Sequence, residues 1–181
     1  MHISTSPYYP LLAGLEMNAF MHKEKGAILW KKAFLSATRF KKALLKDTTL
    51  FRPFLPPLVH GRKWEEEKTS VLMEDAAFFT LGPDETWHGF DSSAADLCLL
   101  DPCKILLTTG TFSERRKHSI PAPLLSAYLE SKGITPEKSD FYTLLFLAEP
   151  GDTKKKYKYL MHWLKQFEKA YFQNCPMDQF M

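Results

Sequence analysis

Three consecutive stretches decide the fold: LLDPCKILLTTG (99–110), SIPAPLLSAYLESKGITPEK (119–138) and SDFYTLLFLAEPGD (139–152). The first and third stretches contain an apolar run, and the second contains an amphipathic segment introduced by proline. Gly110, Gly133 and Gly151 follow the first run, the amphipathic segment and the second run. Short apolar runs bounded by turn residues are typical of strands, whereas apolar residues three and four positions apart are typical of a helix. This order predicts a strand, a helix and a second strand at the centre of a small α/β layer.

We place the strands at 104–109 and 141–147 and the helix at 121–132. Because 141–147 is almost continuously apolar, we expect both of its faces to be buried. Gly133 should end the helix in the left-handed conformation that glycine adopts readily.

A further helix is expected at 152–172, with Asp152 as its N-cap. Its inward stripe comprises Tyr157, Leu160, Met161, Leu164, Phe167 and Tyr171. None of these elements can bury its apolar face alone, so both strands should share one small mixed or antiparallel sheet that the helices cover. The predicted fold class is therefore α/β, with an α+β small domain.

The beginning of the chain predicts two helices, at 7–22 and 27–46. Ser6 is the expected N-cap of the first and Pro7 its first helical residue. Three prolines between 51 and 70 forbid a continuing helix and indicate a linker, after which a short strand is possible at 77–81.

Composition excludes several classes of protein. Of the 181 residues, 45% are hydrophobic and 25% are charged, as in an ordered globular protein. A net charge of +3 gives no indication of nucleic-acid binding, and no apolar run reaches the roughly 18 residues of a membrane span. Three cysteines without a C-x-x-C pair fit a reduced, cytoplasmic compartment and predict no metal site.

The loop GPDETWHGFD (82–91) offers two interpretations. Its carboxylates and His88 could form an acid/base cluster. Alternatively, Trp87 and Phe90 anchor the loop while His88 forms local hydrogen bonds, and we favour this structural interpretation. Residues 4–6, Ser-Thr-Ser at a helix start, could likewise be a simple cap or an anion site.

The order of five motifs resembles the C-terminal half of the bacterial pyridoxal-phosphate-dependent ornithine/lysine/arginine decarboxylases. The motifs are Trp-His-Gly-Phe, Leu-Asp-Pro-x-Lys, Ile-Pro-Ala, Glu-Lys-Ser and Phe-Tyr-x-Leu-Leu-Phe-Leu. MHISTSPYYPLLAGLE, at the start of the chain, resembles the segment that follows the cofactor lysine in that family. The resemblance extends to about Tyr171 and is thin between Lys46 and Phe79.

The resemblance implies a part of a fold type I, aspartate-aminotransferase-like enzyme. Residues 1–50 would be the C-terminal end of the cofactor-binding large domain with its connecting helix, and 51–70 the linker. Residues 71–181 would be the small C-terminal α/β domain, with an incomplete C-terminal extension.

The resemblance also assigns roles to individual residues. Ser4, Thr5 and Ser6 would face the phosphate of pyridoxal 5'-phosphate, reaching it from the neighbouring subunit of a dimer. Glu137 would face the distal amine or guanidinium of the substrate, a task that suits a carboxylate because charge-assisted hydrogen bonds are strong. Trp87 and His88 would lie at the active-site entrance.

The resemblance places the Schiff-base lysine and the acid that holds the cofactor ring upstream of Met1, so we expect no catalytic residue in this chain. We therefore expect a portion of a basic amino-acid decarboxylase that is inactive alone and needs a complementary N-terminal portion or a homo-oligomer. The alternative is a non-catalytic interaction or regulatory protein that binds a full-length decarboxylase. Ornithine, lysine and arginine all present a distal cation to Glu137, so the sequence does not distinguish them.

Overall fold

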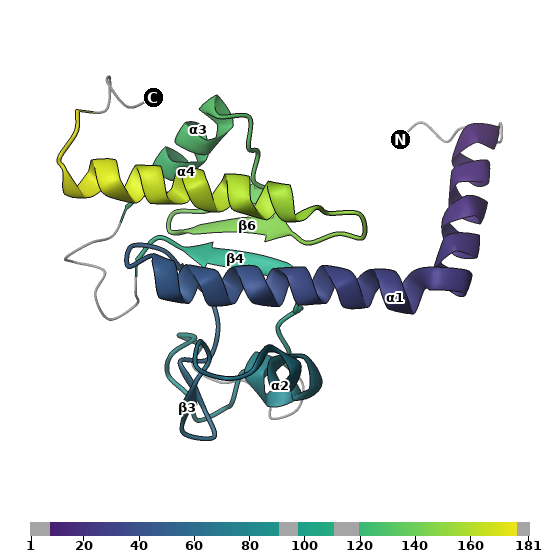
Figure 1. Cartoon of the computed structure of the whole chain (residues 1–181), viewed down its shortest axis with the longest axis horizontal. Helices are drawn as coiled ribbons and strands as arrows, with labels where there is room; N and C mark the ends of the chain where they lie inside the picture. Colours follow the sequence, from purple (N-terminus) through teal and green to yellow (C-terminus); the bar gives the residue numbers. More distant parts are fainter. Residues whose placement is uncertain (1–7, 91–97, 111–119, 177–181) are drawn as a thin grey trace.

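The structure, a computed structural model, describes residues 8–90, 98–110 and 120–176. Within them the chain forms a mixed α/β fold with helices, a small antiparallel sheet and a separate β-hairpin (Figure 1). The elements are α1 (Tyr9–Asp47), β1 (Arg52–Pro53), β2 (Leu58–Val59), β3 (Arg62–Lys63), α2 (Thr69–Glu74), the 3-10 helix η1 (Ala76–Phe79), β4 (Lys104–Thr108), α3 (Ala122–Ser131), β5 (Lys138–Ser139), β6 (Thr143–Leu147) and α4 (Lys154–Phe172). The predicted fold class is confirmed.

The sheet has the strand order β1-β4-β6-β5, and every neighbouring pair is antiparallel. At its centre Ile105 pairs with Phe146 and Leu107 pairs with Leu144. These four side chains belong to one core with residues of α1, α3 and α4. The prediction that both apolar runs lie in one sheet covered by the two predicted helices is therefore confirmed.

The prediction that 141–147 is buried on both faces is wrong. The strand begins at Thr143 and burial alternates along it, while Phe141 is 78% exposed and Leu147 is 39% exposed. Only Leu144 and Phe146 of this strand lie in the core that the helices build. Helices α1, α3 and α4 all contribute to this one core, so the other face of the sheet is left half-covered within the described residues.

Helices α3 and α4 bury the stripes that their periodicity predicts, including Leu125 and Leu129 of α3 and Leu164 and Phe167 of α4. Gly133 follows α3 with φ +75°, as expected for a glycine that ends a helix. The predicted N-cap of α4 is wrong, because the helix begins after Thr153.

Asp152 has a different role next to α4. Its carboxylate accepts a hydrogen bond of 2.9 Å from the Glu149 N–H and one of 2.8 Å from Lys156. It therefore holds the turn before the helix and one residue of the first helical turn.

One helix stands where the sequence predicts two. Helix α1 is 39 residues long and continues through Gly26, although Figure 1 shows a sharp bend in it. A glycine within a helix costs roughly 1 kcal/mol but keeps its backbone hydrogen bonds, so it does not end the helix. Tyr8 is the N-cap and Pro10 lies in the first turn. Ser6 and Pro7, the predicted cap and first helical residue, lie outside the described residues.

The second half of α1 separates two hydrophobic clusters. Phe40 and Leu44 pack into the core of the sheet, whereas Phe34 and Leu45 pack against a second cluster that contains Trp64. In Figure 1 the sheet lies above α1, and β3 and α2 lie below it. None of the helices among the described residues is long and apolar enough to cross a membrane.

The segment predicted to be a linker is ordered and contains three short strands. Its β1 pairs with β4 and so extends the sheet, and β2 and β3 form the hairpin. The strand suggested at 77–81 is instead η1, followed by a single bridge between Thr80 and Leu99. Asp75 begins η1 by accepting a hydrogen bond of 2.9 Å from the Ala77 N–H.

Candidate functional site

His88 is a structural residue of the loop at 82–90. Its ring is only 2% exposed, and its Nε2 lies 2.9 Å from the Gly82 carbonyl oxygen. The Phe90 N–H donates to Nδ1 over 3.1 Å, so Nδ1 is the acceptor and Nε2–H donates to Gly82. Both ring nitrogens are occupied by the backbone of the same loop, which supports the structural interpretation over proton transfer.

Trp87 and Phe90 contribute unequally to this loop. Trp87 packs against Phe54 with ring centroids 5.0 Å apart and donates from Nε1 to Glu85 over 2.9 Å. Phe90 stacks on the ring of His88 but remains 58% exposed. Trp87 therefore anchors the loop, and the anchoring role predicted for Phe90 is wrong.

Trp87 also lines a cavity of about 790 Å³ between the loop and the ordered segment 52–65. Phe54, Thr108 and Gly110 lie in the same wall, and Arg52 and Lys63 bring positive charge to it. Phe54 was not singled out from the sequence, because its contact with Trp87 depends on the turn after β1.

Glu137 lies at a second cavity, of about 440 Å³, next to the first turn of α4. Its side chain is exposed, and its backbone N–H donates to the Leu145 carbonyl over 2.8 Å, so the edge of the sheet fixes its position. Ile105, Phe146 and Tyr157 are among the residues that share this cavity. No described residue forms a hydrogen bond or ion pair with the Glu137 carboxylate.

Two further carboxylates, Glu149 and Asp152, line the cavity of Glu137. Burial alone would raise the pKa of Asp152, but the Glu149 N–H and Lys156 outweigh it and hold that pKa below its usual value. Burial, followed by the charge of Asp152, raises the pKa of the Tyr157 hydroxyl. The cavity thus combines anionic groups with aromatic walls, an arrangement that suits an organic cation.

Among the described site residues, Trp87 and Glu137 line different cavities. Trp87 shares its cavity with Thr108 at the end of β4, whereas Glu137 shares its cavity with Ile105 near the start of that strand. Ser4, Thr5 and Ser6 lie outside the described residues.

Lys41 is a buried lysine that the sequence analysis did not single out. It is 2% exposed, its ammonium donates to the Pro102 carbonyl over 2.7 Å, and it lies 5.5 Å from the centre of the Phe79 ring. Burial lowers the pKa of Lys41 to about 8, although Cys103 and Asp101 act in the opposite direction.

A lowered pKa is one requirement for a lysine that reacts with a carbonyl group. Lys41 fails the other requirement, which is access, since its amine is enclosed and bound to Pro102. Lys41 is therefore not accessible to a carbonyl compound in this structure.

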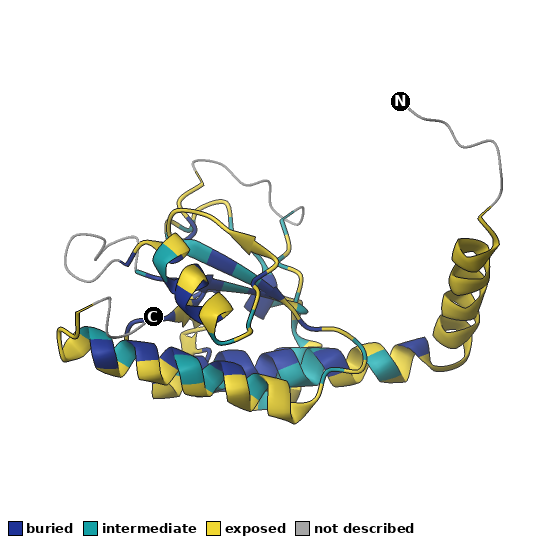
Figure 2. Ribbon diagram, turned by 90° about the horizontal axis from the view of Figure 1, so that it is seen from above, coloured by how far each residue is buried: buried dark blue, intermediate teal, exposed yellow. Residues whose placement is uncertain are grey.

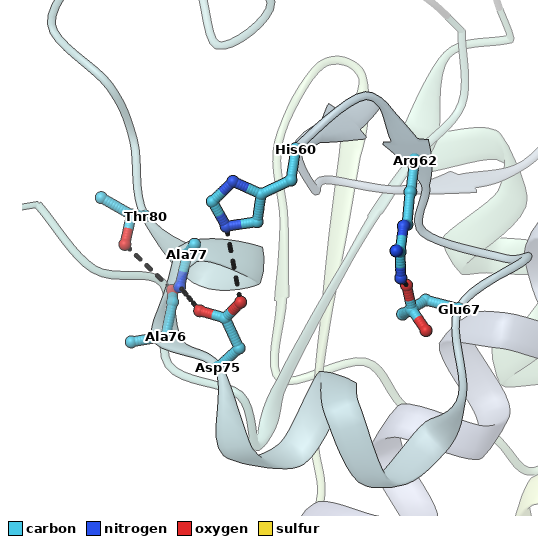
Figure 3. A network of polar contacts seen from close by, with 7 residues as sticks. All are labelled: His60, Arg62, Glu67, Asp75, Ala76, Ala77 and Thr80. Carbon is cyan, nitrogen blue, oxygen red and sulfur yellow. Dashed lines mark hydrogen bonds and ion pairs between the residues drawn. The ribbon is translucent and has the colours of Figure 1, made fainter.

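A polar network joins the hairpin to α2 and η1 (Figure 3). His60 and Gly61 form the turn between β2 and β3 with φ values of 52° and 74°. From this turn His60 reaches Asp75 at 3.5 Å, and Arg62 donates to Glu67 over 2.9 Å. The His60–Asp75 pair is exposed on both sides and contributes little stability, so we assign the network a role in orienting the hairpin.

Comparison with known proteins identifies the family. The model for the Orn/Lys/Arg decarboxylase major domain matches residues 1–156 of this chain. The chain belongs to that family. The match includes both the segment assigned above to the large domain and most of the segment assigned to the small one. Enzymes of the Orn/Lys/Arg decarboxylase family use pyridoxal phosphate.

Relatives from Escherichia coli cover nearly the whole chain. The constitutive ornithine decarboxylase is 43% identical over 98% of this chain and 26% of its own length. The constitutive lysine decarboxylase is 32% identical over 100% of this chain and 25% of its own length. The biodegradative arginine decarboxylase is 28% identical over 100% of this chain and 26% of its own length. The chain therefore spans about a quarter of the length of the curated relatives it matches.

Solved structures also match nearly all of this chain and about a quarter of their own length. Lysine decarboxylase A from Pseudomonas aeruginosa superimposes with a TM-score of 0.80 and 31% identity, over 100% of this chain and 24% of its own chain. The Escherichia coli constitutive lysine decarboxylase gives a TM-score of 0.75 and 32% identity, over 96% of this chain and 24% of its own. The fold described above is thus shared with these lysine decarboxylases.

Proposed function

We propose that this chain is a part of a basic amino-acid decarboxylase that supplies a substrate-facing carboxylate and has no activity alone. The observation that carries the proposal is the 43% identity to an ornithine decarboxylase over 98% of this chain but only 26% of that enzyme. A chain this similar should keep the surfaces by which that part of the enzyme contacts the rest. About three quarters of the enzyme has no counterpart in this chain. The cofactor-holding lysine belongs to the part that is missing.

The substrate side of the proposal rests on Glu137. Its carboxylate is exposed at a cavity of about 440 Å³, and no described residue neutralises it there. A distal ammonium or guanidinium would pair with this carboxylate, and the aromatic side chains of Tyr157 and Tyr159 would flank it. Pyridoxal phosphate would accept the electrons left by departing carbon dioxide, and this chain would orient the substrate.

Ornithine is the substrate we favour among the three basic amino acids. Within Escherichia coli, identity to this chain falls from 43% for the ornithine enzyme to 32% for the lysine enzyme and 28% for the arginine enzyme. These sequence identities are taken over the whole chain, so they do not point to a single residue that selects ornithine.

The first experiment measures activity with and without the missing part. The purified chain is mixed with pyridoxal phosphate and ornithine, and cofactor absorbance and carbon dioxide release are recorded. We expect neither a bound-cofactor spectrum nor turnover. Co-expression with the remaining three quarters of the Escherichia coli constitutive ornithine decarboxylase should restore both. Turnover by the chain alone would refute the proposal.

The second experiment tests Glu137 in the restored complex. Glu137→Gln should raise the KM for ornithine about tenfold or more, since it removes the charge that pairs with the substrate, while the cofactor spectrum stays unchanged. Glu149→Gln, which neutralises another carboxylate of the same cavity, is the matched control and should change KM little. Equal effects of the two variants would contradict a specific role for Glu137. A complex that forms but never turns over would instead favour the non-catalytic binding protein.

A further inference from the structure

Lys132, the C-cap of α3, places its ammonium between two aromatic rings. The ammonium nitrogen lies 5.2 Å from the centre of the Tyr128 ring on α3 and 5.4 Å from the centre of the Trp163 ring on α4. The two ring centroids are 6.2 Å apart and the ring planes are inclined at 72°, so together they form an aromatic corner. Each ring presents the negative charge of its face to the cation.

The walls of the aromatic corner are held by the surrounding structure. Both α3 and α4 bury one side and expose the other (Figure 2), and Tyr128 is only 1% exposed within the core. The rings of Tyr159 and His162 pack edge-on against Trp163, with centroids 6.1 Å and 4.9 Å away. The Tyr159 hydroxyl also donates to the Lys132 carbonyl oxygen over 2.9 Å. The corner therefore depends on the helices and on the backbone of Lys132 but not on its side chain.

The aromatic corner offers the Lys132 ammonium no hydrogen-bond acceptor. Among the described residues, no oxygen forms a hydrogen bond or an ion pair with this ammonium, whereas the buried ammonium of Lys41 donates to Pro102. A primary ammonium has three N–H donors and is strongly hydrated, so it is a poor occupant of such a place. A methylated ammonium carries its charge without these donors, and aromatic walls are the surroundings that recognise it.

We propose that the corner of Tyr128 and Trp163 is a binding site for methylated ammonium groups, which Lys132 occupies when no ligand is bound. Lys132 is half-buried on a flexible four-carbon stem, so its ammonium can leave the rings and enter water. A contact between a partly exposed lysine and an aromatic ring is weak, and a ligand therefore displaces it at little cost. The inference goes beyond the proposed function and involves neither the cofactor nor the missing part of the enzyme.

The test follows the indole N–H signals of the full chain by nuclear magnetic resonance. The chain has four tryptophans, and the signal that disappears in Trp163→Phe belongs to Trp163. The Trp163 Nε1–H has no hydrogen-bond partner among the described residues, so its chemical shift should respond to what occupies the corner. Tetramethylammonium chloride is the ligand, and sodium chloride at equal ionic strength is the control.

We expect a saturable shift of the Trp163 signal, with a Kd in the millimolar range, and no such shift for Trp30, Trp64 or Trp87. The absence of a saturable shift of the Trp163 signal in both the natural chain and Lys132→Ala would overturn the proposal. So would equal shifts of all four signals, because they would show that the salt acts on the whole surface.

Two substitutions of Lys132 separate occupancy from charge. Lys132→Ala and Lys132→Met both remove the positive charge, but only alanine empties the corner, since methionine keeps a long unbranched side chain that packs well on aromatic rings. Lys132→Ala should bind tetramethylammonium at least about fivefold more tightly than Lys132→Met. Equal affinities would mean that Lys132 merely repels cations, which contradicts the proposal. Neither variant removes a residue of the core.

The neighbouring cavity of Glu137 is the alternative place for a cation, because Tyr159 lines it as well. Glu137→Gln should change the affinity for tetramethylammonium less than about twofold, and methylammonium, a primary ammonium, should bind at least about threefold more weakly than tetramethylammonium. Lost affinity in Glu137→Gln, or tighter binding of methylammonium, would assign the cation to the carboxylate and overturn the proposal. None of these measurements involves turnover, so their failure leaves the proposed function untouched.

Discussion

Lys41 is buried, and burial disfavours the charged form of its side chain. Its ammonium is buried between α1 and the residues before β4, with the Pro102 carbonyl as its hydrogen-bond acceptor. Burial lowers its pKa from 10.5 to about 8, so above that pH the folded chain holds a neutral amine where the unfolded chain still holds an ammonium.

Between about pH 8 and pH 10.5 the unfolded chain therefore binds the extra proton, and stability should rise with pH across this window, by up to about 3 kcal/mol. Lys41→Met, which keeps the shape of the side chain but cannot titrate, should remove this rise. Urea denaturation at pH 7.5 and pH 9.5 measures it. Lys32→Met, at an exposed position of the same helix, is the control and should keep the wild-type dependence on pH.

His88 should contribute to stability through the two backbone groups that it pairs. His88→Ala leaves the Gly82 carbonyl and the Phe90 N–H without these partners, and we expect a loss of about 1–3 kcal/mol in the free energy of unfolding. Chemical denaturation measures the loss, with Asp84→Ala in the same loop as control. If His88→Ala were as stable as the control, the structural role would be excluded.

The local role of His88 could be predicted from sequence because its partners lie within six residues. Lys41 could not be singled out in this way, since Pro102 is 61 residues away. A lysine on an amphipathic helix is normally exposed, and only the path of the chain before β4 encloses this one.

At the scale of elements, Gly133 and Gly14 make a matched pair. An added Cβ meets no atom within 4 Å at either position, but Gly133 has a φ of +75° and Gly14 lies within α1. Gly133→Ala should lower the free energy of unfolding by about 1 kcal/mol or more, because it strains the end of α3. Gly14→Ala should increase the helicity of residues 8–25, measured by circular dichroism, without lowering stability. Equal effects of the two substitutions would contradict the backbone explanation.

The elements with strong apolar periodicity were predictable, and those that depend on distant pairing were not. Strands β4 and β6 and helices α3 and α4 follow their sequence patterns closely. Strand β1 forms only because Arg52 and Pro53 meet Thr108 and Leu107, which no local pattern indicates. The two helices predicted at 7–22 and 27–46 form the single helix α1, which continues through Gly26.

At the scale of the whole molecule, residues 8–25 and the core should respond differently to a protease. Opening of 8–25 breaks no tertiary contact, so trypsin should cut after Lys23 and Lys25 well before it cuts between 33 and 47. Limited digestion followed by mass spectrometry measures the order of cleavage. Simultaneous cleavage of both segments would mean that α1 is equally stable along its length.

The complete candidate site could not be predicted or assembled from this chain. Glu137 and Trp87 line separate cavities among the described residues. Where each of them lies depends on the pairing of β1, β4, β5 and β6, which brings together residues far apart in the sequence.

The two halves of α1 differ in what unfolding of each would cost. Residues 8–25 are exposed and belong to neither hydrophobic cluster, whereas Leu44, further along the same helix, is fully buried. A partner that binds residues 8–25 would therefore hold them helical without changing the melting temperature of the core.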